Sequence, residues 1–446
     1  MGASLTVIGA GLAGCEAALQ AANLGVRVDV YDLKPQTMTP AHSNPNYAEL
    51  VCSNSLRGAG RESAVGLLKD ELRRLGSYLM DVADRTAVPA GGALAVDREL
   101  FAAEVTAALR RHSRITCHSQ RICSLDEIGG PRIVATGPLT GEELYADLQQ
   151  RLGQGSLYYF DAVAPLVAAD SLDMDELYFA SRYGKGGGKD YLNAYLSREE
   201  YYDFVRMLTE GERVIRRDFE PGEIFEGCVP IEEIARRGPE SLRYGPLKPT
   251  GLRDPRTGRR PFACVQLRRD DRQAETYNLV GFQTNLTFTA QREIFGKIPG
   301  LRRAKFIRYG VMHRNTYIDS ARILNAALQW KDNPEIFFAG QIAGLEGYVE
   351  AIAGGLLAGV NAAAMISGER MMTPSPRSIL GGLVRAITTP VTDPQPVQSN
   401  WGLQIPFRTA RQDPRRDLSR TESAEEITPW REMLQSRRRR VLLATH

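Results

Sequence analysis

The sequence predicts an α/β fold in which a parallel sheet is built from both ends of the chain and is interrupted by a second, α+β domain. Three observations support this prediction. A strand–helix–strand pattern occupies the first 32 residues, another apolar strand begins at Ile336, and the segment between about 138 and 300 has aromatic clusters and glycine-rich turns. We therefore expect residues 1–137 and 301–446 to form one discontinuous domain, with 138–300 inserted into it.

The first turn of the chain has the glycine spacing of a dinucleotide-binding site. Leu5–Ile8 is an apolar run typical of a buried parallel strand, and Gly9, Gly11 and Gly14 follow in a Gly-x-Gly-x-x-Gly pattern. In this pattern the first glycine forms a tight turn, and the second lets a pyrophosphate approach the backbone. The third lets helix and strand pack closely. We expect the free N–H groups of the following helix to face the phosphates.

The elements after the glycines agree with this interpretation. Residues 15–24 are rich in helix formers, and a second apolar strand, Val26–Tyr31, ends at Asp32. An acidic residue about 20 positions beyond the glycines is the group that accepts hydrogen bonds from the ribose hydroxyls. The first 32 residues therefore predict a bound dinucleotide rather than merely a tight turn.

Further elements of this domain follow in order. Residues 63–77 have the spacing of an amphipathic helix, with Val65, Leu68, Leu72 and Leu75 on one face. Asp97 is expected to cap a helix that runs to about residue 112. Residues 114–122 and 132–135 have the pattern of strands, and the second ends in a small glycine-containing turn.

The segment 336–366 is expected to complete this domain. Ile336–Gln341 is an apolar strand that runs into Gly340, where many flavoproteins place an acid that contacts the ribityl chain. Here Gln341 takes that position, and its amide can still bond a hydroxyl. Tyr348 precedes an Ala- and Gly-rich helix whose N-terminus would face a flavin ring. Tyr348 either stacks on that ring or is an ordinary packed aromatic. These features predict a Rossmann-like FAD-binding domain of the glutathione-reductase type.

Composition narrows the class of protein. The chain has 446 residues, 24% of them charged, and a net charge of +3, so any nucleic-acid surface must be a local patch. No apolar run reaches ~18 residues and no signal peptide is evident, so we expect no membrane span and a cytoplasmic location. Six cysteines without a C-x-x-C pair, and scattered histidines, argue against a disulfide scaffold and against a metal site.

Two cysteines are candidates for reactive thiols. Cys52 lies in a long polar loop, residues 33–60, among small polar residues and is followed by Arg57. Such wet, electropositive surroundings favour the thiolate, although a small buried hydrophobe is an equally good interpretation. Cys228 lies between Gly227 and a Val-Pro turn, which favours an exposed, reactive thiol over core packing.

Clusters of basic residues occur in the second half of the chain. One contains Arg253, Arg256, Arg259 and Arg260 and is followed by Arg268, Arg269 and Arg272; another contains Arg302, Arg303, Lys305, Arg308, His313 and Arg314. Tyrosines are interleaved with the second cluster, which favours phosphate-backbone binding over plain solvated charge. Beyond Gly368 we expect an extended cover over residues 371–410 and a weakly ordered basic tail.

At this point the chain resembles the folate- and FAD-dependent tRNA (uracil-5-)-methyltransferases called TrmFO, which are related to the MnmG (GidA) flavoproteins. The resemblance covers nearly the whole chain. It rests on the segments 7–14, 51–56, 135–140, 181–186, 225–231, 242–249 and 340–348. The departures are mild: Asp32 stands where these proteins usually have Glu, and Val229 where Met is common.

The resemblance implies FAD as cofactor, 5,10-methylenetetrahydrofolate as one-carbon donor, NADH or NADPH as reductant and the T-loop uridine in the T-arm of tRNA as substrate. It also implies two working cysteines, which match Cys52 and Cys228; we favour Cys228 as the nucleophile. The arginines that would hold tRNA phosphates are Arg253, Arg256, Arg259, Arg260, Arg302, Arg303 and Arg314. No obligate protein partner is inferred.

Three other functions remain open from the sequence. A FAD oxidoreductase acting on a small molecule would explain the glycine-rich start but neither the cysteines nor the basic clusters. An RNA-binding flavoprotein with a structural FAD would explain the arginines but not the thiols. A GidA-type enzyme that modifies the wobble uridine of tRNA would also use flavin and folate.

Overall fold

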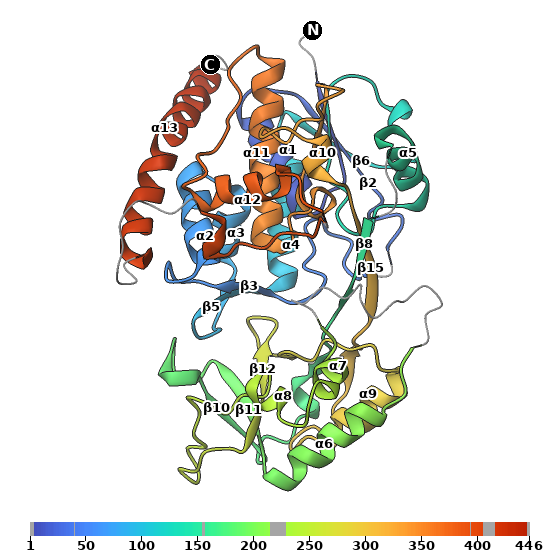
Figure 1. The fold of residues 1–446 in the computed structure, drawn as a ribbon, viewed down its shortest axis with the longest axis vertical. Helices are drawn as coiled ribbons and strands as arrows, with labels where there is room; N and C mark the ends of the chain where they lie inside the picture. The colour runs from blue at the N-terminus through green and yellow to red at the C-terminus, as the bar shows by residue number, and fades with distance from the viewer. Residues whose placement is uncertain are drawn as a thin grey trace.

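The described residues form two large sheets, each with its own hydrophobic core, and two smaller ones. The computed structural model describes residues 4–39, 41–153, 157–214, 229–392, 394–404 and 415–443. A five-stranded sheet and a six-stranded sheet lie in the upper and lower halves of an elongated molecule (Figure 1). The predicted α/β fold with an added α+β domain is confirmed.

The five-stranded sheet is entirely parallel and has the order β16-β7-β1-β2-β6. Its strands are β1 (Leu5–Ile8), β2 (Val28–Asp32), β6 (Ile115–Ser119), β7 (Arg132–Val134) and β16 (Ile336–Phe338). β1 and β16 are buried along their whole length, as expected for parallel strands covered on both faces. The two ends of the chain therefore meet in one sheet, with β7 between β1 and β16.

Two helices with small residues at their interface pack against one another and cover this sheet. They are α1 (Leu12–Asn23) and α11 (Tyr348–Ile366). A methyl group at Gly355 or Gly359 would lie only 2.2 or 2.4 Å from a backbone oxygen of α1, so both positions require glycine. Gly355 meets Ala13 and Gly359 meets Ala17, so the two helices run in the same direction and their N-terminal ends lie on the same side of the sheet.

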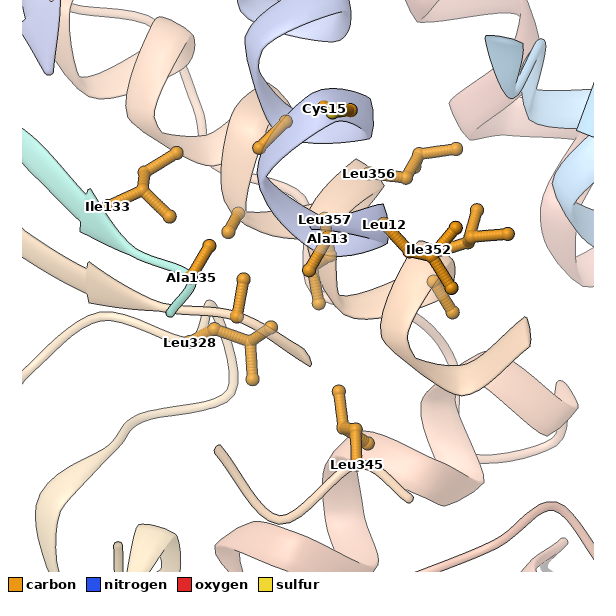
Figure 2. Packing of buried hydrophobic residues seen from close by; sticks show 14 of the residues in the cluster. Leu12, Ala13, Cys15, Ile133, Ala135, Leu328, Leu345, Ile352, Leu356 and Leu357 are labelled. Atoms are coloured by element: carbon orange, nitrogen blue, oxygen red, sulfur yellow. The ribbon is translucent and has the colours of Figure 1, made fainter. Parts of the chain in front are cut away.

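Side chains around this contact form the centre of the first core. Figure 2 shows Leu12 of α1 close to Ile352 and Leu356 of α11. Helix α11 is long and apolar enough to cross a membrane, but 83% of its most apolar 18-residue stretch is buried inside the protein. Its hydrophobicity is therefore accounted for by packing in the core.

Shorter helices and a small antiparallel sheet complete this half of the molecule. They are α2 (Ala64–Leu75), α3 (Tyr78–Arg85), α4 (Arg98–Arg111), α5 (Glu142–Leu152), α10 (Ser320–Ile323), β3 (Ser55–Gly58), β4 (Ala87–Val88) and β5 (Ala93–Val96). The side chain of Ser63 caps α2, and the Asp97 carboxylate accepts the Leu100 N–H at 2.9 Å to cap α4. The helices expected over 63–77 and 97–112 are thus confirmed.

The second sheet is antiparallel and has the order β10-β11-β12-β13-β9-β14. Its strands are β9 (Leu166–Ala168), β10 (Leu177–Ala180), β11 (Tyr191–Leu196), β12 (Ala263–Arg269), β13 (Thr276–Leu279) and β14 (Phe306–Arg308). Its helices are α6 (Arg198–Glu210), α7 (Ile231–Arg236), α8 (Ser241–Tyr244) and α9 (Phe288–Phe295). The aromatic residues Tyr201, Phe282 and Phe295 are almost fully buried in its core.

A two-stranded ladder connects the two halves. β8 (Leu157–Ala162) pairs antiparallel with β15 (Met312–Tyr317). Helix α5 precedes this ladder and contributes Leu144 and Leu148 to the first core, whereas β14 belongs to the second sheet. We therefore propose that the domains join within this ladder, rather than at the expected boundaries of 138 and 300.

The expectation of an extended cover over 371–410 is wrong for one part of it. Residues Ile379–Thr388 form the helix α12. Its N-terminus is held by the Glu71 carboxylate of α2, which accepts the N–H groups of Ile379 and Leu380 at 2.8 and 2.9 Å. The glycines inside this segment concealed a helix whose stability comes from tertiary contacts.

The basic tail also differs from the expectation. Residues 415–443 form the helix α13 (Arg415–Leu443), which lies along α2 at the left of Figure 1. Ile427 and Leu434 are buried, and Arg438 donates to the Gln20 side chain at 2.6 Å. Several of the tail's arginines therefore hold the helix to the first domain.

Candidate functional site

A cleft of about 430 Å³ opens at the carboxyl ends of the parallel strands, where ligands of open α/β sheets bind. Its walls come from the glycine-rich turn, the loop after β2, the turn after β7 and the segment before α11. The predicted residues that line it are Gly9, Gly11, Asp32, Cys52, Gln341 and Tyr348. The structure thus brings together residues from both ends of the chain around one cleft.

The three glycines of the first turn are required for different reasons. Gly9 has φ = 98°, and a methyl group there would lie 2.6 Å from the Ala135 oxygen. At Gly14 a methyl group would lie 1.8 Å from the Gly9 oxygen. At Gly11 it would meet nothing within 4 Å, so the space beside this residue is open cleft. This opening and the free N–H groups at the start of α1 fit a ligand phosphate.

Asp32 lies at the end of β2 and holds the turn in place. One carboxylate oxygen accepts the Ala10 N–H at 2.6 Å, and the other accepts the Lys34 N–H at 2.9 Å. Both oxygens keep lone pairs for a further donor. The contact with a ribose hydroxyl stays a prediction, but the carboxylate faces the cleft beside the phosphate opening.

The loop after β2 is tied down by a buried ion pair. Lys34 and Glu49 are both almost fully buried, and their charged groups lie 2.7 Å apart. Burial opposes ionisation of Glu49, but hydrogen bonds from Lys34 and from the Ser43 N–H hold its pKa below the usual value. The loop is therefore an ordered wall of the cleft, and it includes the short strand β3.

Cys52 lies in this wall, half-buried, with its backbone held from two sides. Its N–H donates to the Tyr348 hydroxyl at 2.7 Å, and the Ser53 N–H donates to the same hydroxyl at 3.1 Å. Its carbonyl accepts from Arg308 of β14 at 3.2 Å. Burial raises the pKa of Tyr348, so this hydroxyl stays neutral and accepts both bonds. Tyr348 thus positions the Cys52 loop; stacking of its ring on a flavin stays a prediction.

The surroundings of Cys52 contain cations that the sequence did not reveal. Arg98 of α4 is buried and pairs with Asp270 at 2.9 Å, and two of its side-chain nitrogens have no hydrogen-bond partner. Burial lowers the pKa of Arg308 to about 10. The Cys52 thiol and the Tyr348 hydroxyl are among the titratable groups close enough to interact electrostatically with both arginines. The sequence places Arg308 in a basic cluster expected to bind phosphates, whereas in the structure its side chain donates to the Cys52 carbonyl in the cleft wall.

A second clamp joins the same loop to α11. Glu350 is fully buried and accepts from the Arg57 guanidinium and from the Ser399 N–H, the latter at 2.8 Å. Arg57 is the residue expected to make the Cys52 loop electropositive. Its charge is largely compensated by this carboxylate, just as Asp270 compensates Arg98, so Arg308, which donates to the Cys52 carbonyl, is the cation that contacts the Cys52 main chain.

At the far wall, Gly340 and Gln341 begin the turn before α11. Gly340 has φ = 76°, and a methyl group there would lie 2.7 Å from the Ala13 side chain. The Gln341 amide donates to the Glu346 carboxylate and lines the cleft. A contact between Gln341 and a ribityl chain stays a prediction.

Cys228 lies outside the described residues. The described chain resumes at Val229, and the Ile231 N–H donates to the Gln283 carbonyl at 2.7 Å. Gln283 itself lines the cleft. Among the described residues all five cysteines are free thiols, and Cys52 is the one that lines this cleft.

The two arginine clusters meet at one segment of the second domain, residues 175–177. Arg256 donates to carbonyls of this segment and pairs with Asp254 at 2.8 Å; Arg302 lies 3.3 Å from Glu176. The other described members of the two predicted sets, Arg253, Arg259, Arg260 and Arg303, are exposed like Arg256 and Arg302. The side chain of Arg314 lies outside the description. Acidic neighbours thus compensate Arg256 and Arg302, and RNA binding by these arginines stays a prediction.

Comparison with known proteins adds the family context. A family model described as "Glucose inhibited division protein A" matches residues 4–370. The chain is 52% identical over 428 residues to a methylenetetrahydrofolate–tRNA-(uracil-5-)-methyltransferase TrmFO of Geobacter sulfurreducens, covering 95% of this chain and 98% of that relative. The same-named protein of Pelobacter propionicus is 53% identical over 403 residues, or 90% and 88% of the two chains.

Among solved structures, GidA of Aquifex aeolicus superimposes with a TM-score of 0.69. The match covers 97% of this chain and 75% of that one at 17% sequence identity, so it is a likeness of fold.

Proposed function

Because the chain belongs to the GidA family and, within it, to the TrmFO methyltransferases, we propose that it methylates C5 of the T-loop uridine in the T-arm of tRNA. The enzyme class is methylenetetrahydrofolate–tRNA-(uracil-5-)-methyltransferase, and the enzyme depends on FAD and on methylenetetrahydrofolate. We further propose NADH or NADPH as the source of electrons and the cytoplasm as the place of action.

The cleft fits FAD at the residues that the glycine pattern selects. The pyrophosphate would lie over Gly11 at the start of α1, where the structure leaves open space, and Asp32 would hold the ribose. Gln341 and Tyr348 would border the flavin, with the N-terminus of α11 directed at it. When bound, FAD supplies the reducing electrons that turn the transferred one-carbon unit into a methyl group.

The chemistry of uracil explains why a thiol must be present. C5 of uracil is a weak nucleophile. When a thiolate forms a bond to C6, the electron pair of the C5–C6 double bond moves to C5 and is stabilised by the neighbouring carbonyl. C5 can then accept the one-carbon unit. Loss of the C5 proton to a base expels the carrier of that unit and leaves an exocyclic methylene, which becomes the methyl group by taking up a hydride as the sulphur–C6 bond breaks. Two protein groups, a nucleophile and a base, are therefore required.

Cys52 and Cys228 are proposed for these two roles. Cys52 lies in the cleft wall, and its main chain is fixed by Tyr348 and Arg308. The buried cations Arg98 and Arg308 favour a negatively charged sulphur next to them. We assign Cys228 as the nucleophile and Cys52 as the acid/base or protecting thiol. The cleft contact of Gln283, which bonds Ile231 shortly after Cys228, supports this pairing.

The proposal rests mainly on the position of Cys52. It lies in the wall of a cleft that fits a dinucleotide, near Arg98 of the first domain and Arg308 of the second. The decisive assay incubates the purified FAD-bound protein with unmodified tRNA, labelled methylenetetrahydrofolate and NADPH, and then maps the label. We expect label in 5-methyluridine of the T-loop. Label at the wobble position would instead indicate GidA-type chemistry, and oxidation of a small molecule without labelled RNA would indicate a plain oxidoreductase.

The cysteine roles have their own test. Cys52→Ala and Cys228→Ala should each abolish turnover while FAD and tRNA still bind. Cys123→Ala is a matched control, because Cys123 is half-buried but does not line the cleft. Full turnover of either of the first two variants would refute the role assigned to that cysteine.

A further inference from the structure

Next to the proposed active site lies a second cavity, of about 220 Å³, to which no role has been given. It is lined by Phe288, Phe306, Ile307, Arg308, Tyr309 and Val311, together with Ala41, Val51 and Val163. The last three residues also line the main cleft, so the two hollows adjoin. Val51 immediately precedes Cys52, and Arg308 donates to the Cys52 carbonyl at 3.2 Å. The cavity therefore lies directly beside the thiol.

Three aromatic rings form a ladder along this cavity. The rings of Phe288 and Tyr309 are stacked at 4.6 Å with an angle of 16°, and those of Tyr309 and Phe306 at 5.0 Å with an angle of 11°. Phe306 continues into the second core through a tilted contact with Phe295. The ladder thus runs from the domain core to the edge of the cavity with its ring planes nearly parallel.

The outer end of this ladder is unusually open for an apolar surface. Phe288, the first residue of α9, is 50% exposed, and Ile307 on β14 is 60% exposed. Packing in the core explains the position of Phe306, but it does not explain why the ring of Phe288 is half exposed. On α9 the exposed Arg292 lies one turn beyond Phe288 and therefore on the same face of the helix. A nucleobase can stack on an exposed aromatic ring while its phosphates bind to cations beside that ring.

We propose that the ladder of Phe288, Tyr309 and Phe306 is a stacking platform for a tRNA base beside the target uridine. The inference rests on the proposed function, because that function brings a T-loop to this cleft. A target base must leave its stack to reach the thiols, which deprives its neighbour of a stacking partner. RNA loops are read in this way, with unstacked bases laid on aromatic side chains. A half-exposed ring at the cavity edge is placed to accept that neighbour.

The expected effect is a loss of RNA affinity that does not depend on charge. Phe288→Ala should weaken tRNA binding by roughly 5- to 150-fold, the range for one lost base–aromatic stack. Phe288→Tyr should restore binding to near the wild-type value because it keeps the ring. The slope of affinity against salt should stay unchanged in both variants, since no phosphate contact is removed. Tyr244→Ala, at an exposed aromatic of α8, is the matched control and should bind normally.

The experiment measures tRNA binding to the FAD-bound variants across a salt series, together with folate binding. A second readout uses tRNA with 2-aminopurine next to the target uridine. Its fluorescence should be quenched by stacking on the wild type and much less on Phe288→Ala. Unchanged tRNA affinity in Phe288→Ala would overturn the proposal. A loss confined to folate binding would also overturn it and would assign the cavity to the one-carbon donor.

The two proposals fail in different ways. If the wild type does not label the T-loop but its tRNA binding still requires the ring, the proposed function fails and the platform stands. If the wild type labels the T-loop and Phe288→Ala binds tRNA equally well, the platform alone is refuted.

Discussion

The glycines of the first turn permit a sharp test, because the structure separates a glycine required by the ligand from one required by the fold. At Gly11 a methyl group would meet no protein atom within 4 Å, and the backbone there has φ = −74°, which alanine adopts freely. At Gly14 a methyl group would lie 1.8 Å from the Gly9 oxygen. Gly11→Ala and Gly14→Ala add the same atom three residues apart, with different expected consequences.

The magnitudes follow from these distances. Gly11→Ala changes only the helix-cap preference of the apoprotein, which is worth less than about 1 kcal/mol. In the FAD-bound protein the new methyl group occupies the space of the pyrophosphate. Overpacking of this kind costs about 1–3 kcal/mol, which corresponds to roughly 5- to 150-fold weaker FAD binding. Gly14→Ala forces the backbone of the turn to move in either state, so the apoprotein itself should lose about 3 kcal/mol or more.

Two measurements check this reasoning. Thermal unfolding of the apoproteins should show a nearly unchanged melting temperature for Gly11→Ala and a decrease of several degrees for Gly14→Ala. Titration with FAD, followed by quenching of flavin fluorescence, should show the affinity loss in Gly11→Ala. Wild-type FAD affinity in Gly11→Ala would refute the placement of the phosphates over this residue. An apoprotein of Gly11→Ala as unstable as that of Gly14→Ala would refute the assignment of open space there.

Three further predictions use other parts of the structure. Burial lowers the pKa of Lys69 from 10.5 to about 7, so the unfolded chain binds more protons between those pH values and stability should rise with pH through that window. Urea unfolding at pH 7, 8 and 9 should show a smaller rise in Lys69→Met than in the wild type; an identical rise would contradict the assignment. Arg308→Gln should slow iodoacetamide labelling of Cys52 at pH 7 several-fold, as judged by mass spectrometry of the labelled peptide, because a cation beside the thiol is lost. An unchanged rate would show that the arginine does not favour the thiolate. The Arg259→Ala/Arg260→Ala variant should weaken tRNA binding and lower the salt slope by up to about 2, while NADPH still reduces the flavin. Equal loss of both activities would indicate misfolding rather than lost phosphate contacts.

Much of the fold was predictable because its signals are local in the sequence. The first strand, the glycine turn and the acid at position 32 follow one another within a single β-α-β unit, and Asp97 caps its own helix. The helix α12 could not be predicted in the same way. Its N-terminus is satisfied by Glu71, a partner 308 residues away, and its own glycines weaken the local helical signal.

In the candidate site, too, local sequence signals were predictive and contacts between distant residues were not. The composition around Cys52 left a reactive thiol and a small buried hydrophobe equally open, and Arg57, the cation that favoured the thiolate, is paired with Glu350. Two further cations lie near Cys52: Arg98, which follows a helix cap in the sequence and is itself paired with Asp270, and Arg308, which lies within a run of basic residues. No pattern distinguishes an inward-pointing arginine of such a run from its solvent-exposed neighbours.

The sequence by itself determined the nucleotide-binding turn and the alternation of strands and helices, because these depend on contacts between residues close together in the chain. The tertiary structure alone decided which charges surround Cys52, how Tyr348 and Arg308 hold it, and where three aromatic rings align. These features depend on side chains that come from separate elements, and their distances are set by how two domains pack. The interaction of two charges weakens with the distance between them, and stacking requires direct contact, so the function of such residues is decided by packing rather than by order along the chain.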